Sequence, residues 1–114
     1  MATNSSRKDV SFVMDHFDLR RFFTAIVTRD DYAHPKPAPD AFVTAAAQLG
    51  LSPGACVVIE DAHKGILAAH QAGTPVIAMP NTYTCNNDFS LATRQLPNMD
   101  ALSPAVIDSI LRSA

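Results

Sequence analysis

Glu60 and Asp61 are adjacent carboxylates that directly follow an apolar run at residues 56–59. A helix-compatible segment starts just after them and stops at Gly73. In open α/β sheets, ligands bind at the carboxyl ends of the strands, which is where such a pair would lie. With no obvious basic partner close by in the sequence, two carboxylates suit a hard cation such as Mg²⁺. The alternative is that Asp61 only caps the helix, although a cap needs a single carboxylate.

Hydroxyl, amide and ammonium groups follow other predicted strands. Residues 3–6, with the sequence TNSS, put hydroxyls and turn amides at the start of a predicted helix, a natural place to bind an anion. The simpler alternative is that Ser5 or Ser6 only caps that helix. Lys36 stands between prolines that would fix the direction of its ammonium group, unless it is an ordinary solvated loop lysine. Together with the carboxylates, these groups predict a site for a phosphate and a divalent cation.

The remaining polar residues near strand ends have simpler interpretations. Asn81 follows an apolar strand and is expected to form a turn, and the pair Asp30 and Asp31 is expected to be polar loop structure. The four histidines have no Cys or His partner at metal-ligand spacing, which favours surface or capping roles. No serine, cysteine or aspartate stands in an arrangement that would attack phosphorus.

Short apolar runs alternate with amphipathic segments, a pattern typical of a parallel α/β sheet. Because the apolar runs do not alternate with polar residues, the sheet should be covered on both faces. Strands are predicted at residues 2–3, 25–28, 56–59 and 75–79. Helices are predicted at residues 7–16, 40–49, 63–72 and 103–111, with one or two helical turns at 88–93.

Composition limits the classes of protein that fit. The chain has 114 residues, 47% of them hydrophobic, which is enough for one small domain with a core. A net charge of −2 with scattered basic residues gives no support for nucleic-acid or membrane-surface binding. The chain has no apolar run near the ~20 residues of a membrane span and no apolar signal core. Its two cysteines are expected to be free thiols, so a cytoplasmic location is predicted.

The motifs ATNSS, KPAPDAF, VVIEDAHKGILAAHQAG and VIAMPN resemble the haloacid dehalogenase superfamily of phosphohydrolases. The similarity is greatest to its phosphoglycolate phosphatase and β-phosphoglucomutase-like branch. The resemblance implies a Rossmann-like, three-layer parallel sheet. It also implies that Thr3 and the backbone of Asn4 contact phosphate, and that Lys36 stabilises the charged phospho-aspartyl intermediate. Glu60 and Asp61 would form the acidic motif, with Asp61 the direct Mg²⁺ ligand.

The sequence departs from the family at the first motif, D-x-D-x-T, which supplies the nucleophile and lies upstream of the hydroxyl motif. Here Met1 stands directly before that hydroxyl motif. We therefore expect residues 1–114 to be a partial catalytic core that lacks the first strand and the helical cap and is inactive alone. The alternatives are a phosphomutase fragment, a non-catalytic module that binds phosphate and cation, or, less favoured, a receiver-type signalling domain.

The resemblance also suggests partners. The substrate would be a small phosphorylated metabolite, whose identity the missing cap would select. In the family, the first strand lies between the strands predicted at residues 2–3 and 56–59. Without it, either these two strands close up or another chain fills the slot, and self-association through open edges is expected.

Overall fold

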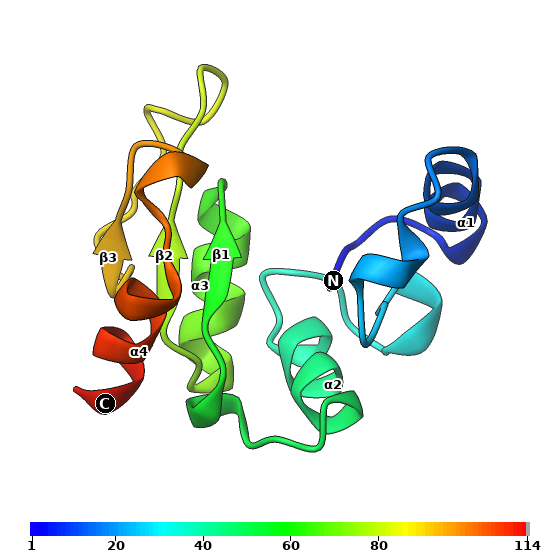
Figure 1. Cartoon of the computed structure of the whole chain (residues 1–114), viewed down its shortest axis with the longest axis horizontal. Helices are drawn as coiled ribbons and strands as arrows, with labels where there is room; N and C mark the ends of the chain where they lie inside the picture. Colours follow the sequence, from blue (N-terminus) through cyan, green and yellow to red (C-terminus); the bar gives the residue numbers. More distant parts are fainter. Residues whose placement is uncertain (114) are drawn as a thin grey trace.

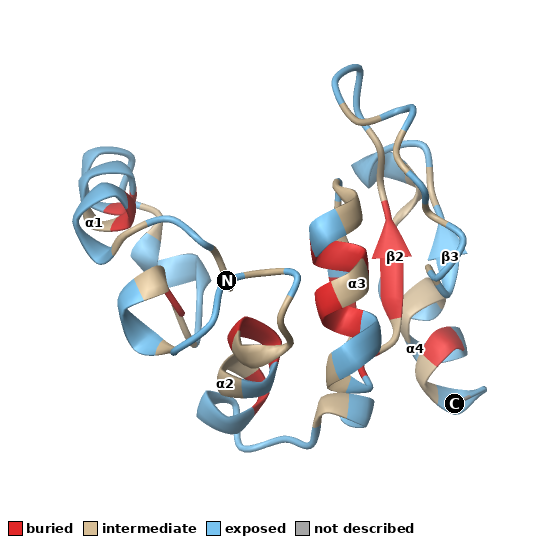
Figure 2. Cartoon of the chain, turned by 180° about the vertical axis from the view of Figure 1, so that it is seen from behind, coloured by how far each residue is buried: buried red, intermediate tan, exposed pale blue. Residues whose placement is uncertain are grey.

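The computed structural model describes residues 1–113, of which residues 58–112 form an α/β structure in three layers (Figure 1). Helix α3 (His63–Ala72) covers one face of a small parallel sheet, and α4 (Pro104–Arg112) lies on the other face (Figures 1 and 2). The α-helices are α1 (Arg7–His16), α2 (Asp40–Gln48), α3 (His63–Ala72) and α4 (Pro104–Arg112). The strands are β1 (Val58–Glu60), β2 (Val76–Ala78) and β3 (Arg94–Gln95).

The sheet has the order β1-β2-β3, and all its described strands run parallel. Val58 pairs with Val76, and Glu60 pairs with Ala78, so the carboxylate pair follows the carboxyl end of β1. All three residues of β2 are buried, as expected for a strand covered by helices on both faces. The main core cluster joins this strand to α2 and α3 through Phe42, Ile66 and neighbouring apolar side chains.

The first residues lie apart from this sheet, next to α1 (Figure 1). Ala2 and Val27 form an isolated parallel bridge, with hydrogen bonds from Thr3 N to Val27 O and from Val27 N to Met1 O. Among the described residues, no backbone pairing joins this bridge to β1. The strands predicted at residues 2–3 and 56–59 are therefore not paired with each other.

Local signals account for the helix boundaries. Ser6 Oγ accepts from Asp9 N at the start of α1, so the capping interpretation of this serine is confirmed. Gly73 ends α3 with a φ of 74°, a left-handed conformation that glycine adopts at little cost. Ser103 caps α4.

Four predicted elements differ from the structure. The strand predicted at residues 2–3 is reduced to the single bridge at Ala2. Residues 88–93 form turns rather than helical turns, and a short strand, β3, follows them. The strand predicted at 25–28 is reduced to the single bridge at Val27, because it has one short neighbour to pair with. The strand predicted at 56–59 is displaced to Val58–Glu60, because pairing with β2 defines it.

The prediction of a sheet covered on both faces is correct for β2 and wrong for part of β1. Ile59 is 41% exposed, although residues of a parallel strand are normally buried. β1 stands at the edge of the described sheet, with no neighbouring strand on one side. Within residues 1–113, no helix is long and apolar enough to cross a membrane.

Asp31 ties α1 to the segment after the Val27 bridge. Its carboxylate accepts from Thr28 N at 2.8 Å and from Arg7 Nη2 at 2.8 Å. The hydrogen bond from Thr28 N, followed by the one from Arg7, holds the pKa of Asp31 below its ordinary value. A lowered folded-state pKa stabilises the fold above the unfolded-state pKa of about 3.9, and this contribution disappears as the pH falls through the folded-state value.

We therefore expect Asp31→Asn to be destabilised at pH 7 and to approach the parent protein in stability below about pH 4. Urea unfolding at a series of pH values measures this difference. Asp108→Asn, at an exposed position on α4, is the control and should give a small difference that does not depend on pH. A difference for Asp31→Asn that stays constant from pH 7 to pH 3 contradicts the assignment.

Candidate functional site

Lys36 lies at the centre of the candidate site and bonds both to the first residues of the chain and to the end of β1. Its Nζ donates to Ala2 O at 3.2 Å and to Glu60 Oε1 at 2.5 Å. The side chains of Lys36 and Glu60 are each 12% exposed, so this ion pair is largely removed from water. Nζ also lies 4.6 Å from the centre of the Phe42 ring on α2, a cation–π contact. The ammonium is therefore held in one place from three sides.

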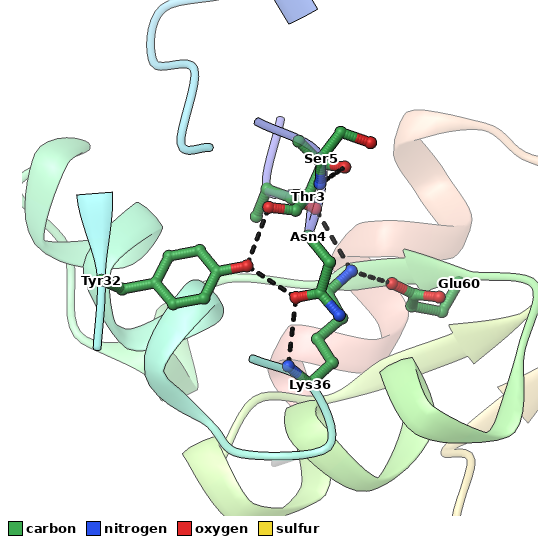
Figure 3. A network of polar contacts seen from close by, with 7 residues as sticks. Thr3, Asn4, Ser5, Tyr32, Lys36 and Glu60 are labelled. Carbon is green, nitrogen blue, oxygen red and sulfur yellow. Dashed lines mark hydrogen bonds and ion pairs between the residues drawn. The ribbon is translucent and has the colours of Figure 1, made fainter. Parts of the chain in front are cut away.

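Asn4 and Tyr32 fix the loop that carries the lysine (Figure 3). Asn4 Oδ1 accepts from Lys36 N at 3.1 Å and from the Tyr32 hydroxyl at 2.6 Å. That hydroxyl also lies 2.8 Å from Thr3 O, so its single proton is shared between two acceptors. Burial raises the pKa of Tyr32, which keeps the phenol protonated as this donor role requires. Tyr32 is thus a positioning residue that pattern reading did not find.

Several hydrogen-bond donors near Lys36 have no partner among the described residues. An ammonium has three protons, and Lys36 Nζ uses two of them on Ala2 O and Glu60. Thr3 Oγ1 accepts from Ser5 N at 3.1 Å, which leaves the hydroxyl proton free to donate. No hydrogen bond is formed by the backbone N–H of Asn4 within residues 1–113. One ammonium, one hydroxyl and one amide proton are therefore free to bind an anion.

Glu60 occupies space that a glycine provides. A Cβ built on Gly65, in the first turn of α3, would overlap the Glu60 carboxylate, whose atoms are its three nearest neighbours. Any larger residue at position 65 would displace this carboxylate from Lys36. The glycine of the E-D-A-x-x-G pattern thus has a steric reason, which the sequence alone does not give.

Asp61 lies outside the lysine network. It is exposed, and its Oδ2 accepts from Asn81 Nδ2 at 3.0 Å. Asn81 forms the expected turn as well, because its Oδ1 accepts from the backbone N–H groups of Tyr83 and Thr84. Asp61 does not cap α3. Instead, Asn87 Oδ1 accepts from the first backbone N–H of that helix.

The structure gathers Thr3, Asn4, Lys36 and Glu60 into one network, while Asp61 stands next to it in sequence and bonds elsewhere. Glu60 has no basic partner close by in the sequence, and the partner that it has in the structure, Lys36, comes from a distant loop. Among the described residues, no group of three or more potential metal-ligating side chains is found, so the metal role of Glu60 and Asp61 stays a prediction.

The other polar residues singled out in the sequence have structural partners. Asp30 Oδ1 accepts from Arg7 N, and Asp31 binds Thr28 and Arg7 as described above. The hydrogen bond from His34 N, followed by the contact of His34 Nδ1 with Asp40 Oδ2 at 3.1 Å, holds the pKa of Asp40 below its ordinary value.

The sequence profile described as haloacid dehalogenase-like hydrolase matches residues 1–79, which include every residue of the lysine network and Asp61. The chain belongs to this family. Within it, the chain resembles protein CbbY of Rhodobacter capsulatus, with 38% identity over 88 residues, 77% of this chain and 39% of that protein. It also resembles the fructose-1-phosphate phosphatase YqaB of Escherichia coli, with 40% identity over 68% of this chain and 41% of that protein.

Solved structures of haloacid dehalogenase-like hydrolases match the fold. CbbY from Rhodobacter sphaeroides in complex with phosphate superposes with a TM-score of 0.85 and 32% identity, covering 94% of this chain and 49% of that one. A complex of the same protein with xylulose-(1,5)bisphosphate gives a TM-score of 0.84 and 32% identity, over 93% of this chain and 49% of that one. The chain thus spans about half of these solved chains and about two fifths of the two relatives above.

Proposed function

We propose that residues 1–114 are part of the catalytic core of a Mg²⁺-dependent phosphatase that acts on small phosphate esters. The observation that carries this proposal is the position of Lys36, which is bonded to the end of the first segment and to the end of β1. The third proton of Lys36 Nζ and the unpaired donors of Thr3 and Asn4 belong to the same network. Donors of this kind, carried by residues of one hydrogen-bonded network, suit the oxygens of a phosphoryl group.

In the proposed site, Lys36 and Thr3 donate to phosphate oxygens, and the backbone N–H of Asn4 adds a third hydrogen bond. Glu60 orients the lysine and balances its charge while no phosphate is bound. Because Phe42 and the partly buried surroundings exclude water, the ammonium acts at a lower effective dielectric than on an open surface. Charge that develops on the phosphoryl oxygens would be stabilised there without reorganisation of the loop.

The residues present fit a magnesium ion. Asp61 offers an exposed carboxylate next in sequence to Glu60, which binds Lys36, and Asn81 holds one of its oxygens. Mg²⁺ is usually held by one or two carboxylates together with waters and substrate phosphate oxygens, so a cage made only of protein is not required. We propose Asp61 as the direct ligand, with Glu60 nearby in support. When bound, the ion would neutralise phosphate charge.

The substrate class rests on the relatives. One is named as a fructose-1-phosphate phosphatase, and the structure of another holds a sugar bisphosphate. A small phosphorylated sugar or similar metabolite is the substrate that we propose here. The cytoplasmic location predicted from the sequence stays a prediction.

We further propose that the nucleophile comes from outside residues 1–114. The carboxylates at the site have other roles, because Glu60 is paired with Lys36 and Asp61 is bonded to Asn81. Covalent phosphoryl transfer needs an activated nucleophile, and donors alone supply only electrostatic stabilisation.

The test is turnover of p-nitrophenyl phosphate by the purified chain in the presence of Mg²⁺. We expect no hydrolysis above the background rate. Turnover that Lys36→Met abolishes and Lys64→Met preserves would contradict this expectation, since it would require a nucleophile within the chain. Lys64 is an exposed lysine on α3 outside the network, so its replacement controls for loss of charge.

A further inference from the structure

The segment between β2 and β3 begins with an asparagine that contacts the candidate metal ligand. Met79 N donates to Glu60 O at 2.7 Å, so the chain leaves β2 directly beside the end of β1. Further along, Asn81 Nδ2 donates to Asp61 Oδ2 at 3.0 Å. Figure 1 shows the loop that contains this asparagine, residues 80–88, beyond the carboxyl ends of β1 and β2. Asn81 therefore lies at the same end of the sheet as the acidic pair.

The direction of the Asn81 amide is fixed by the backbone of the loop. Its Oδ1 accepts from Tyr83 N at 2.8 Å and from Thr84 N at 3.1 Å. Asn81 N donates to Thr84 Oγ1 at 3.0 Å, which closes the same turn a second time. Because two N–H groups occupy the amide oxygen, the Nδ2 group is the one that faces Asp61. A reversed amide would lose both backbone bonds and would place an oxygen against a carboxylate.

A second contact holds the same loop against the start of α3. The N-cap residue of this helix, Ala62, has no side chain that could accept a hydrogen bond. Asn87 Oδ1 instead accepts from His63 N at 3.0 Å, and the imidazole of His63 lies 2.7 Å from a carbonyl oxygen of the loop. The loop is thus bonded both to Asp61 and to the helix that starts just after it. These contacts limit how far Asn81 can move relative to the carboxylate.

Asp61 has one oxygen left for a ligand. Its Oδ2 accepts from Asn81, and within residues 1–113 its Oδ1 forms no hydrogen bond. Both side chains are exposed, and such a bond is normally weak because water competes for both partners. Here the amide is already held by the turn, so little side-chain freedom is lost when it bonds the carboxylate. A carboxylate oriented through one oxygen can offer the other to a cation.

We propose that Asn81 is a positioning residue for Mg²⁺ binding, which holds Asp61 in one rotamer so that Oδ1 is available to the ion. Carboxylates that bind a metal are themselves hydrogen-bonded, and loss of such a partner typically weakens metal binding about 10–100-fold. An amide suits this role because it donates to the carboxylate without adding a positive charge that would repel the cation. This role rests on the proposed function, in which Asp61 is the direct ligand. The turn predicted from the sequence is then only part of what Asn81 does.

Two substitutions at position 81 separate positioning from the turn. In Asn81→Ser, the hydroxyl can still accept from the backbone N–H groups of Tyr83 and Thr84, although more weakly, but it has no group that reaches Asp61. Asn81→Asp keeps an oxygen that accepts in the turn and removes the donor. Asn98→Ser is the matched control, because Asn98 Oδ1 also accepts from a backbone N–H two residues on and Asn98 forms no hydrogen bond with Asp61.

The first measurement uses the metal-free chain. NMR couplings from Cγ of Asp61 to its backbone nitrogen and carbonyl carbon report the χ1 rotamers of this side chain. We expect one rotamer in the parent protein and in Asn98→Ser, and averaging over rotamers in Asn81→Ser and Asn81→Asp. A role confined to the turn would leave Asp61 unchanged in Asn81→Asp. Averaging in the parent protein, or an unchanged rotamer in either variant at position 81, would overturn the proposal.

The second measurement is titration with Mg²⁺ alone, followed by the amide NMR shift of Asp61. The apparent Kd should rise about tenfold in Asn81→Ser and change by less than about twofold in Asn98→Ser. Equal affinities of the parent protein and Asn81→Ser would overturn the positioning role and leave the magnesium site in place. Absence of any response to Mg²⁺ at Asp61 in the parent protein would instead overturn the proposed magnesium site, and the role of Asn81 with it.

Discussion

Lys36→Met should lower the free energy of unfolding by about 3 kcal/mol, because it leaves the Glu60 carboxylate largely buried without its counter-ion. The loss goes beyond a surface ion pair, which contributes about 0–1 kcal/mol. The substitution also removes the bond to Ala2 O and the contact with Phe42, so the first segment loses one of its ties to the rest of the chain. Urea unfolding followed by circular dichroism measures the effect.

Lys64→Met is the matched control and should change stability by less than about 0.5 kcal/mol, since this lysine is exposed. Adding Glu60→Gln to Lys36→Met should recover part of the loss, because the neutral amide no longer needs a counter-ion. Equal effects of the two lysine substitutions would show that the ion pair contributes nothing beyond an ordinary surface charge.

Gly65→Ala is expected to destabilise the protein by about 2 kcal/mol, although alanine is the better helix former by about 1 kcal/mol. The new methyl group would overlap the Glu60 carboxylate, which must turn away from Lys36. The cost thus arises from a broken ion pair rather than from the helix. Gly54→Ala is the control, because a Cβ there would meet only Gly73 O at 3.9 Å.

A double-mutant cycle separates the two contributions. In a Glu60→Ala background, the carboxylate that the methyl group would overlap is gone. The same Gly65→Ala change should then cost little or become stabilising through helix propensity. If Gly65→Ala costs the same in both backgrounds, the steric link between Gly65 and Glu60 is wrong.

Sequence reasoning predicted the elements that local signals define. The boundaries of α1 and α3 follow from Ser6 and Gly73, whose effects are confined to one helical turn. The strands were less predictable, because β1 and β3 exist only where a neighbouring strand pairs with them. Residues 88–93 were predicted as helical turns, because over so few residues a turn sequence resembles the apolar pattern of a short helix.

The candidate site was also predictable only in part: its residue types could be predicted, and its contacts could not. The types of residue at positions 3, 36, 60 and 61 indicated phosphate chemistry, and the family is confirmed. Their partners could not be read from spacing, because Tyr32 meets Asn4 across 28 residues and Lys36 meets Glu60 across 24. The role of Tyr32 can be recognised only from the three-dimensional structure. The space that Gly65 leaves for a carboxylate is likewise a property of packing.

The central claim is that Thr3, Asn4 and Lys36 bind phosphate beside a cation held by Asp61. Titration of the isotopically labelled chain with inorganic phosphate, followed by amide NMR shifts, tests it most directly. We predict shifts at these three amides, tighter binding with Mg²⁺, loss of the Mg²⁺ effect in Asp61→Asn, and loss of all shifts in Lys36→Met. Shifts confined to other regions, or a response that Lys36→Met leaves intact, would contradict the account.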